Sequence, residues 1–417
     1  MKKLLPILIL LISSALLIFY RFTDIPKFLA PDEVDFARLA YSLENKPYAP
    51  YSQLATGHST LYFYILLASL KTFGANIFAL RLPAAIFGVL SVLIFYLVLK
   101  TTLEKQLKNE PMKQWLPFLL SMILLTSRWF LNFARFSFEP TFLLFLELAS
   151  IYFLLRCINT SKYLYFILCG LFSGLAFLSY TPGRIFFILP LSFFVFKLVD
   201  SLTHKQFDNK IIKQLLYFLI PFVIIITPLT SYLLINKDSR VDQQFLLTNH
   251  ELSFNEKASG LWNNIFSTTL MFFTKGDMNG RHNFPGKPAL NPILGILFIF
   301  GSILTIKQWK NDSNKLFLFY FLISLLPALV TYSWENPNML RTYTSLPSIV
   351  FFIGQGMIFL FKKNIQIVCL TLMMIICISS AYELHTYFVY QPFSFKNSFN
   401  QPDYLPVIHK DAQNKQK

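Results

Sequence analysis

The stretch ALRLPAAIFGVLSVLIFYLVL, residues 79–99, decides the fold class, because it places a single charge in a run long enough to cross a bilayer. A transmembrane α-helix needs about 20 apolar residues to span a hydrocarbon core about 30 Å thick. Similar runs recur along the whole 417-residue chain, and 54% of its residues are hydrophobic. The sequence therefore predicts an all-α, polytopic transmembrane protein.

Eleven segments qualify as candidate membrane spans. They cover residues 4–20, 79–99, 116–131, 140–155, 163–179, 185–200, 214–235, 290–306, 316–332, 343–361 and 365–381. The apolar run 61–70 is too short to cross, so we expect an interfacial helix that lies on the membrane. We predict one transmembrane domain over 1–381, followed by a short outer tail over 382–417 whose last dozen or so residues are disordered.

Basic residues define the expected orientation. The net charge of +16 would suggest a nucleic-acid partner for a soluble protein. In a membrane protein, however, Lys and Arg concentrate in cytoplasmic loops. With Lys2 and Lys3 placed in the cytoplasm, every second loop between the predicted spans is basic. We therefore expect a cytoplasmic N-terminus, a lipid bilayer as the surroundings and no nucleic-acid partner.

The acidic pair Asp32–Glu33 lies in the first long loop predicted to be outside, over 21–78. One interpretation is helix capping, with Asp32 as the N-cap and Asp35 three residues on. The other is catalysis, in which one carboxylate acts as a general base for an acceptor hydroxyl or amine. Long connections are usually functional, so we favour an active-site role, with which capping is compatible.

Glu139 is a second candidate acid, between two predicted spans on the outer side. It could belong to the active site. It could also cap the next helix, with Pro140 at the first helical position, where proline is favoured. Both interpretations stay open at the level of sequence.

Cationic side chains gather at the predicted outer ends of the spans, against the usual distribution of basic residues. Arginines flanked by aromatic residues can simply extend to the membrane interface. Several guanidinium groups near a carboxylate would instead form a phosphate pocket, because the planar fork of Arg binds two oxygens at once. The candidates are Arg135 and Arg341 first, followed by Arg128, Arg184, Arg281 and His282.

Several common cofactor motifs are missing from the sequence. It contains no Gly-x-x-x-x-Gly-Lys-Ser/Thr loop, no dinucleotide fingerprint, and no His-Glu-x-x-His or paired-Cys metal motif. We therefore expect no nucleotide cofactor, and the pattern leaves the question of a divalent metal open.

In the order and spacing of its motifs, the sequence resembles the GT-C type membrane glycosyltransferases. The resemblance is to the bacterial relatives of the dolichyl-phosphate-mannose protein mannosyltransferases and the lipid A aminoarabinose transferase. Pro31-Asp-Glu-Val-Asp-Phe-Ala-Arg-Leu-Ala-Tyr41 is similar to the family's Asp-Glu motif, and His58-Ser-Thr-Leu-Tyr-Phe63 to its His-Pro-Pro-Leu-Tyr element. Arg135-Phe-Ser-Phe-Glu-Pro140 resembles the acidic segment of its second outer loop.

The resemblance implies a glycosyltransferase, either a hexosyl- or a pentosyltransferase, in the bacterial plasma membrane with its active site on the outer face. The donor would be a polyprenyl-phosphate-linked sugar, and the acceptor a lipid, glycan or protein. Asp32 would be the base, and arginines would hold the departing phosphate. Glu33 and Glu139 would shape the site or bind a metal if one is used. His58 would contact phosphate or metal, and Arg184 would replace a lysine that is frequent in the family.

Two other functions also fit a chain with this many spans. A transporter or flippase of lipid-linked sugars would place charges near the bilayer midplane, where Glu147 is the clearest acid. A surface-polysaccharide polymerase or ligase also uses lipid-linked sugars on the outer face. Such enzymes typically lack an acidic pair in the first outer loop. The discriminating observation is whether Asp32 and Glu33 line a cavity together with the arginines.

Overall fold

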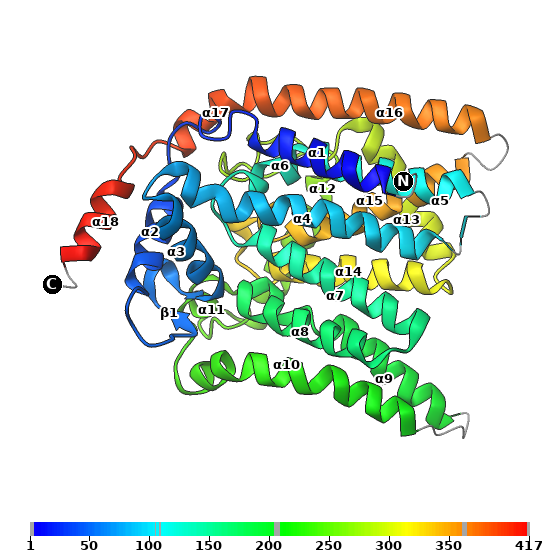
Figure 1. Ribbon diagram of the computed structural model, residues 1–417, viewed down its shortest axis with the longest axis horizontal. Coiled ribbons are helices and arrows are strands. Elements are labelled where there is room, and N and C mark those ends of the chain that lie inside the picture. Colours follow the sequence, from blue (N-terminus) through cyan, green and yellow to red (C-terminus); the bar gives the residue numbers. More distant parts are fainter. Residues whose placement is uncertain (1–3, 105, 108–109, 204–208, 361–364, 415–417) are drawn as a thin grey trace.

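The computed structural model describes residues 4–104, 106–107, 110–203, 209–360 and 365–414. Most of this chain forms long helices that run back and forth along the horizontal axis of Figure 1. Within the described ranges the only sheet is an antiparallel pair, β1 (Tyr51–Ser52) with β2 (His58–Ser59). Lys2 and Lys3, which anchor the predicted orientation, lie outside the described residues.

Helices occupy all eleven predicted spans. These are α1 (Leu5–Phe19), α4 (Ile77–Leu103), α5 (Glu110–Thr126) with α6 (Arg128–Ala134), α7 (Pro140–Thr160), α8 (Tyr163–Ser179), α9 (Ile188–Thr203), α10 (Asn209–Ile235), α13 (Pro292–Lys307), α14 (Asp312–Leu329), α15 (Leu346–Leu360) and α16 (Ile365–His385). Among the described residues, five helices are long and apolar enough to cross a membrane, or up to six if the bent pair α5–α6 is one span. The all-helical character is therefore confirmed, while the number of crossings stays a prediction.

The predicted span over 116–131 is not one straight helix. α5 ends at Thr126, α6 begins at Arg128, and the two helices meet at an angle of 66°. Every residue of α6 is buried. The bend brings α6 against a long loop that follows α12, where the Asn132 side chain donates a 2.6 Å hydrogen bond to the carbonyl oxygen of Arg281.

Glycines allow some of the helices to approach closely. A Cβ atom on Gly301 of α13 would lie 1.7 Å from the carbonyl oxygen of Phe352 on α15. On Gly170 of α8 it would lie 2.1 Å from the carbonyl oxygen of Phe218 on α10. Any larger residue would force these helices apart. In a bilayer, where lipid is as apolar as the helix surface, such close backbone packing is a main source of helix association.

The segments predicted to be outside gather at one end of the helix layer, on the left of Figure 1. They form α2 (Pro31–Ser42), α3 (Leu61–Phe73), α11 (Ser239–Gln244), α17 (Gln391–Ser398) and α18 (Leu405–Asn414), together with β1 and β2. The run 61–70, predicted to be an interfacial helix, is the larger part of α3. Chain segments that are distant in sequence therefore meet at this end.

The end of the tail, predicted to be disordered, is helical up to Asn414. Leu405 and Ile408 of α18 are buried, and the ring of His409 stacks on Tyr41 of α2 at 5.1 Å between centroids. The prediction of disorder is therefore wrong, because it considered the polar composition of the segment and not the two apolar residues that reach a neighbouring helix.

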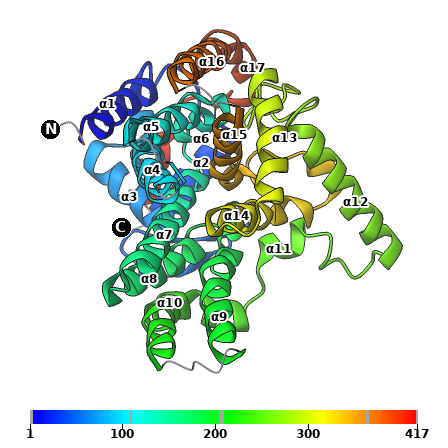
Figure 2. The same ribbon diagram turned by 90° about the vertical axis from the view of Figure 1, so that its right-hand side faces the viewer.

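A further helix, α12 (Phe254–Met271), lies in the second long outer segment, where no apolar run predicted one. It begins with a capping box, in which Ser253 accepts the N–H of Glu256 and the Glu256 carboxylate accepts the N–H of Ser253. Seen end-on, α12 lies at the edge of the bundle beyond α13 (Figure 2).

Candidate active site

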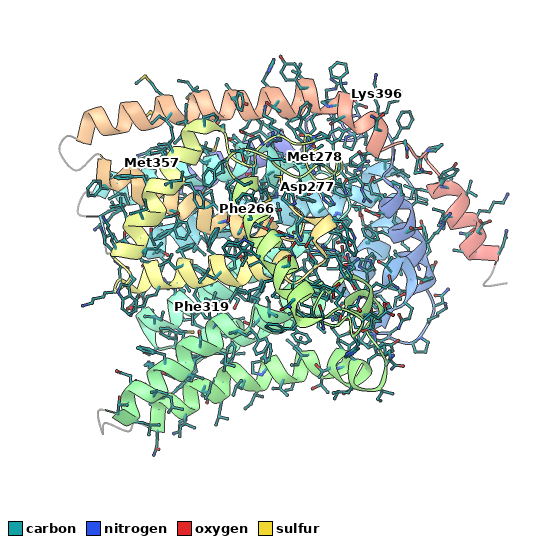
Figure 3. The ribbon with its side chains drawn as sticks, turned by 180° about the vertical axis from the view of Figure 1, so that it is seen from behind. Phe266, Asp277, Met278, Phe319, Met357 and Lys396 are labelled. Carbon is teal, nitrogen blue, oxygen red and sulfur yellow. The ribbon has the colours of Figure 1, made fainter. Side chains whose placement is uncertain are left out.

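A cavity of about 550 Å³ opens at the end of the bundle where the outer segments meet. Its walls come from α2, from the turn before β2, from α11, and from loops 277–282 and 334–341. Figure 3 shows two of its lining residues, Asp277 and Met278, side by side near the middle of the view. The charged and titratable lining residues are Asp32, Asp35, His58, Arg240, Asp277, Arg281, His282, Glu335 and Arg341.

Asp32 lies in the first turn of α2 and faces this cavity. The helix begins at Pro31, a position where the missing N–H of proline is not needed. The Asp32 side chain is 33% exposed and forms an ion pair with the guanidinium group of Arg281. A fixed helix start and a charged partner thus hold one carboxylate at the cavity wall.

Glu33, the neighbouring acid, points into the protein instead. Its two oxygens accept hydrogen bonds of 2.8 and 2.9 Å from Arg81 of α4, and both side chains are fully buried. The carboxylate also accepts the backbone N–H groups of Ala30 and Ser137, each at 3.0 Å. Glu33, and not Asp32, therefore caps α2. Its predicted catalytic role is not supported by this geometry, since successive helix residues point about 100° apart.

Arg135, a first candidate for phosphate binding, also lies away from the cavity. Its guanidinium group donates hydrogen bonds of 2.5 to 3.2 Å to the carbonyl oxygens of Leu17, Ile18, Arg21 and Ile25. These carbonyl groups belong to the end of α1 and the turn after it, where helix carbonyls lack partners. Arg135 therefore closes the end of α1, and the structure does not bring it to the other candidate residues.

His58 and Glu139 form a buried pair at the wall of the cavity. His58 Nδ1 lies 2.5 Å from a Glu139 oxygen, and His58 Nε2 lies 2.9 Å from the carbonyl oxygen of Ala55. Glu139 immediately precedes α7, and Pro140 is the first residue of that helix, as predicted. The Glu139 side chain makes no capping hydrogen bond, so its main partner is His58.

Burial and charge set the protonation of this pair. Burial, together with the positive charge of Arg240, lowers the pKa of His58, and Glu139 only partly offsets this effect. Burial alone would raise the pKa of Glu139, but its interactions with His58 and with the positive charge of Arg240 outweigh burial and lower the pKa. Both groups therefore resist protonation.

Arg240, at the start of α11, is a cavity residue that sequence analysis missed. Its Nη1 lies 2.9 and 3.1 Å from the two ring nitrogens of His58, and its guanidinium group lies 5.2 Å from the ring centroid of Tyr180. In the part of the chain that the structure describes, no carboxylate pairs with it. It was missed although it follows the predicted span 214–235 by only five residues. The available signal was Asp238, a typical N-cap residue just before it.

Arg184 lies behind the cavity wall. It forms an ion pair with Asp238 and donates a 3.3 Å hydrogen bond to the Ser59 hydroxyl. Burial alone would raise the pKa of Asp238, but Arg184 and the hydroxyl of Tyr51 outweigh it and lower the pKa. Arg184 therefore joins α11, with Arg240 on it, to the β1–β2 pair, and its guanidinium charge is neutralised by Asp238.

Arg341 lines the cavity from the loop before α15. It forms an ion pair with Glu335 and donates a 3.0 Å hydrogen bond to Gln244. Its Nη1 is buried without a hydrogen-bond partner. On the opposite loop, His282 lies 2.9 Å from Asp277, whose same oxygen accepts the backbone N–H of Met339 at 2.9 Å. This last contact ties the two loops of the cavity together.

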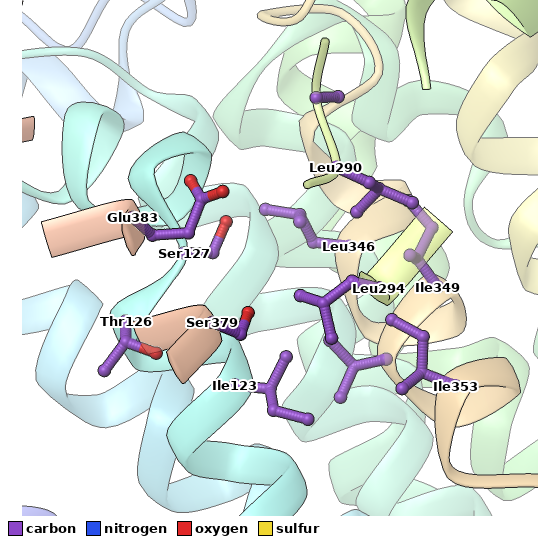
Figure 4. A pocket seen from close by; sticks show the side chains of 12 residues that line it. Ile123, Thr126, Ser127, Leu290, Leu294, Leu346, Ile349, Ile353, Ser379 and Glu383 are labelled. Atoms are coloured by element: carbon purple, nitrogen blue, oxygen red, sulfur yellow. The ribbon is translucent and has the colours of Figure 1, made fainter. Parts of the chain in front are cut away.

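A second cavity, much smaller, lies between α5, α13, α15 and α16 (Figure 4). Its volume of about 10 Å³ admits at most one water molecule. Arg128 lies beside its Glu383, at 3.9 Å, and donates to the carbonyl oxygen of Pro288, so it does not reach the main cavity. Within the described ranges, no group of three or more His, Cys, Asp or Glu side chains gathers to hold a metal.

Comparison with known proteins identifies the fold that carries this cavity. Residues 57–232 match the family model described as dolichyl-phosphate-mannose-protein mannosyltransferase. Among solved structures, ArnT from Cupriavidus metallidurans bound to undecaprenyl phosphate is similar, with a TM-score of 0.57 and 12% identity. The chain has the fold of the GT-C membrane glycosyltransferases. AglB from Archaeoglobus fulgidus, an archaeal oligosaccharyltransferase in complex with an inhibitory peptide and a dolichol-phosphate, is similar at a TM-score of 0.53 and 14% identity.

The extent of the match differs between the two chains of each comparison. The ArnT alignment covers 89% of this chain and 63% of ArnT, and the AglB alignment covers 94% of this chain and 56% of AglB. The chain thus spans less than two thirds of these GT-C proteins. A comparison with curated proteins finds no match.

Proposed function

We propose that this chain is a membrane glycosyltransferase that moves a sugar from a polyprenyl-phosphate donor to an acceptor in the 550 Å³ cavity. The observation that carries the proposal is that Asp32 shares this cavity with three arginines, of which Arg240 has no carboxylate partner in the described ranges. The family match and the lipid phosphates named with ArnT and AglB support the same donor class.

The proposed reaction is a single displacement at the anomeric carbon. Asp32 takes the proton of an acceptor hydroxyl or amine, whose oxygen or nitrogen forms the new bond to that carbon. The bond between the carbon and the phosphate oxygen breaks on the opposite side, so the configuration inverts. Its electron pair leaves with the polyprenyl phosphate, which gains one negative charge. Arg281 orients the Asp32 carboxylate through their ion pair.

Cationic groups would stabilise the charge that develops on the departing phosphate. Arg240 has donors that no carboxylate occupies within the described residues, and Arg341 has a buried Nη1 without a partner. Guanidinium groups held in place before the reaction stabilise developing charge without reorganisation. His58, held by Glu139, lies 2.9 Å from Nη1 of Arg240 and so helps to position it. Glu139 is therefore a positioning residue in this proposal.

The proposal also includes a location. The outer segments and the cavity lie at the same end of the bundle. By the distribution of basic residues, that end would face away from the cytoplasm. We therefore propose a multi-pass protein of the bacterial plasma membrane that acts at the outer surface on a lipid, glycan or protein acceptor.

The test replaces Asp32 by Asn in purified protein and measures transfer of labelled sugar from undecaprenyl-phosphate-linked sugars. Loss of a general base lowers the rate by about 10²- to 10⁴-fold. Asp24→Asn is the matched control, because Asp24 is an exposed carboxylate of the same loop that does not line the cavity. If Asp32→Asn transfers sugar as fast as the control, Asp32 is not the base.

A transport function has less support from the structure. Glu147, the clearest acid within a span, is buried in α7 and accepts a 2.7 Å hydrogen bond from Tyr320 of α14. It lines neither of the two cavities described above. The observation that separates the candidate functions is whether Asp32 and Glu33 line a cavity together with the arginines. Asp32 lines the cavity with the arginines, whereas Glu33 does not.

A further inference from the structure

An aromatic pair stands at the mouth of the cavity. Trp334, in the loop after α14, lines the cavity and is 78% exposed. Its indole ring lies parallel to the ring of Tyr332, with 4.3 Å between centroids and 8° between planes. Tyr332 is anchored in turn, because its hydroxyl accepts a 2.9 Å hydrogen bond from Asn249. One face of the indole is thus covered by protein, which leaves the other face as a flat apolar surface.

Leaving such a surface in contact with water costs the folded protein free energy. A large aromatic ring left in contact with water forgoes the favourable free energy of burial. Stacking on Tyr332 holds the indole in this exposed position. An aromatic face carries negative charge density, and it attracts groups that present polarised hydrogen atoms. The flat face of a pyranose ring presents C–H groups of this kind.

Three side-chain amides line the same cavity, and the oxygen of each one already accepts a hydrogen bond from the protein. The side-chain oxygen of Asn338 accepts the N–H groups of Leu340 and Arg341, at 3.1 and 3.0 Å. The oxygen of Asn279 likewise accepts the N–H of Arg281 at 3.0 Å, and the oxygen of Gln244 accepts from the Arg341 side chain at 3.0 Å. All three residues line the cavity. Because their oxygens are occupied, their NH₂ groups remain to donate hydrogen bonds.

We infer that Trp334 is a stacking platform for a pyranose ring, with the three amides as hydrogen-bond donors to the hydroxyl groups of the sugar. A flat apolar surface beside several neutral donors suits a ligand that is apolar on its faces and polar at its rim. A phosphate alone would not use the indole face, and a hydrocarbon chain would leave the amides without partners. The inference rests on the proposed function, because it names the sugar as the part of the substrate bound here.

The test compares Trp334→Ala and Trp334→Phe with the wild type in two measurements. The first is the affinity for undecaprenyl-phosphate-linked hexose and for undecaprenyl phosphate alone. The second is the KM for a glycan acceptor. We expect Trp334→Ala to weaken binding of the sugar-bearing ligand about tenfold, which is a typical scale for one aromatic contact, and Trp334→Phe to weaken it less. Trp262→Ala is the matched control, because Trp262 is 68% exposed on α12 but does not line the cavity.

The two measurements separate the source of the sugar ring. Weaker binding of the hexose donor with unchanged binding of undecaprenyl phosphate assigns the platform to the donor sugar. A raised acceptor KM with unchanged donor binding assigns it to an acceptor glycan. If Trp334→Ala equals the wild type in both, or weakens undecaprenyl phosphate as much as the hexose donor, the inference is overturned. The proposed function fails separately, through an Asp32→Asn variant that still transfers sugar.

Discussion

Buried Arg81 and the cavity arginines Arg240 and Arg341 differ in how their charges are used. Arg81 of α4 donates with all three of its guanidinium nitrogens to carboxylate and carbonyl oxygens that the protein supplies. The guanidinium groups of Arg240 and Arg341, at the cavity, are only partly occupied by partners from the described part of the chain. No carboxylate in the described part of the chain pairs with Arg240, and one nitrogen of Arg341 has no hydrogen-bond partner.

This difference teaches that burial alone does not indicate a binding role. A buried guanidinium group whose donors are satisfied contributes to folding, and removing its partner leaves an isolated charge. A guanidinium group that lines a cavity with free donors is held ready for an anion that the protein does not supply. The comparison therefore predicts that Arg81 variants lose stability, while Arg240 and Arg341 variants lose activity.

The largest effect should come from Arg81→Met. This change leaves the fully buried carboxylate of Glu33 without its ion-pair partner, and breaking a buried pair in this way costs about 3 to 5 kcal/mol. The free energy of unfolding in detergent, measured by denaturant titration, checks the prediction. The double variant Arg81→Met with Glu33→Leu should recover much of the loss, because it removes both charges. Equal stability of Arg81→Met and the wild type would contradict the structural role.

A smaller effect, now on activity, should come from Arg240→Gln. Removal of one preorganised donor to a developing charge lowers the rate by about 10²- to 10³-fold. We expect this loss in sugar transfer, with little change in the midpoint of thermal unfolding. Arg38→Gln is the control, because the Arg38 side chain is 61% exposed and does not line the cavity. A variant of Arg240 that unfolds early but transfers sugar normally would reverse the comparison.

The burial of His58 beside Arg240 should make the stability of the protein depend on pH. The pKa of His58 is lowered in the folded protein, so the unfolded chain binds more protons and stability rises with pH. The contribution is complete above about pH 6.5, the ordinary pKa of His, and is lost as the pH falls below it. The lowered pKa of Glu139 acts in the same direction at lower pH.

Thermal unfolding between about pH 7.5 and about pH 5 checks this expectation around the ordinary pKa of His. The unfolding midpoint of the wild type should fall on acidification by more than that of His58→Asn. His250→Asn is the control, because His250 is exposed and outside the cavity. Parallel curves for the wild type and His58→Asn would show that protonation of His58 does not destabilise the folded protein.

The smallest effect should come from His409→Ala in α18. The stacked contact between His409 and Tyr41 is one aromatic pair, and such pairs contribute about 0.5 to 1.5 kcal/mol. We expect a modest fall in the free energy of unfolding, with transfer activity retained. His409→Tyr, which keeps an aromatic ring at the position, should restore most of the loss. No difference between the Ala and Tyr variants would mean that the tail does not stabilise α2.

Most of the fold could be predicted, because membrane helices are defined by the length of their apolar runs. The helices that were missed lack such runs. In α12, charged and amide residues interrupt the apolar positions, although its capping box at Ser253 and Glu256 was readable. In α18, Leu405 and Ile408 are too few to indicate a helix until the neighbouring α2 is known. The break at Ser127 within 116–131 was also missed, although the polar triplet Thr126-Ser127-Arg128 interrupts the apolar run at that point.

The residue types of the site could be predicted, but it was harder to predict which of the candidate residues face the cavity. Asp32, His58, Arg281, His282 and Arg341 do share one cavity. Their catalytic and binding roles stay predictions. The sequence could not separate Asp32 from its neighbour, because the direction of each side chain depends on the residue at which α2 begins. Arg135 was favoured for its place at the end of a span, which is also where a guanidinium group can satisfy the carbonyls of another helix.

The cavity draws its walls from segments that the ribosome produces at very different times. Asp32 and His58 emerge early, whereas the loop that carries Arg341 follows α14, late in the chain. A nascent chain that has inserted only its first helices therefore holds an acid and an imidazole without the opposite wall. The cavity is therefore complete only after the loop that follows α14 has been made, and an unfinished copy cannot yet surround a ligand with all of these charged groups.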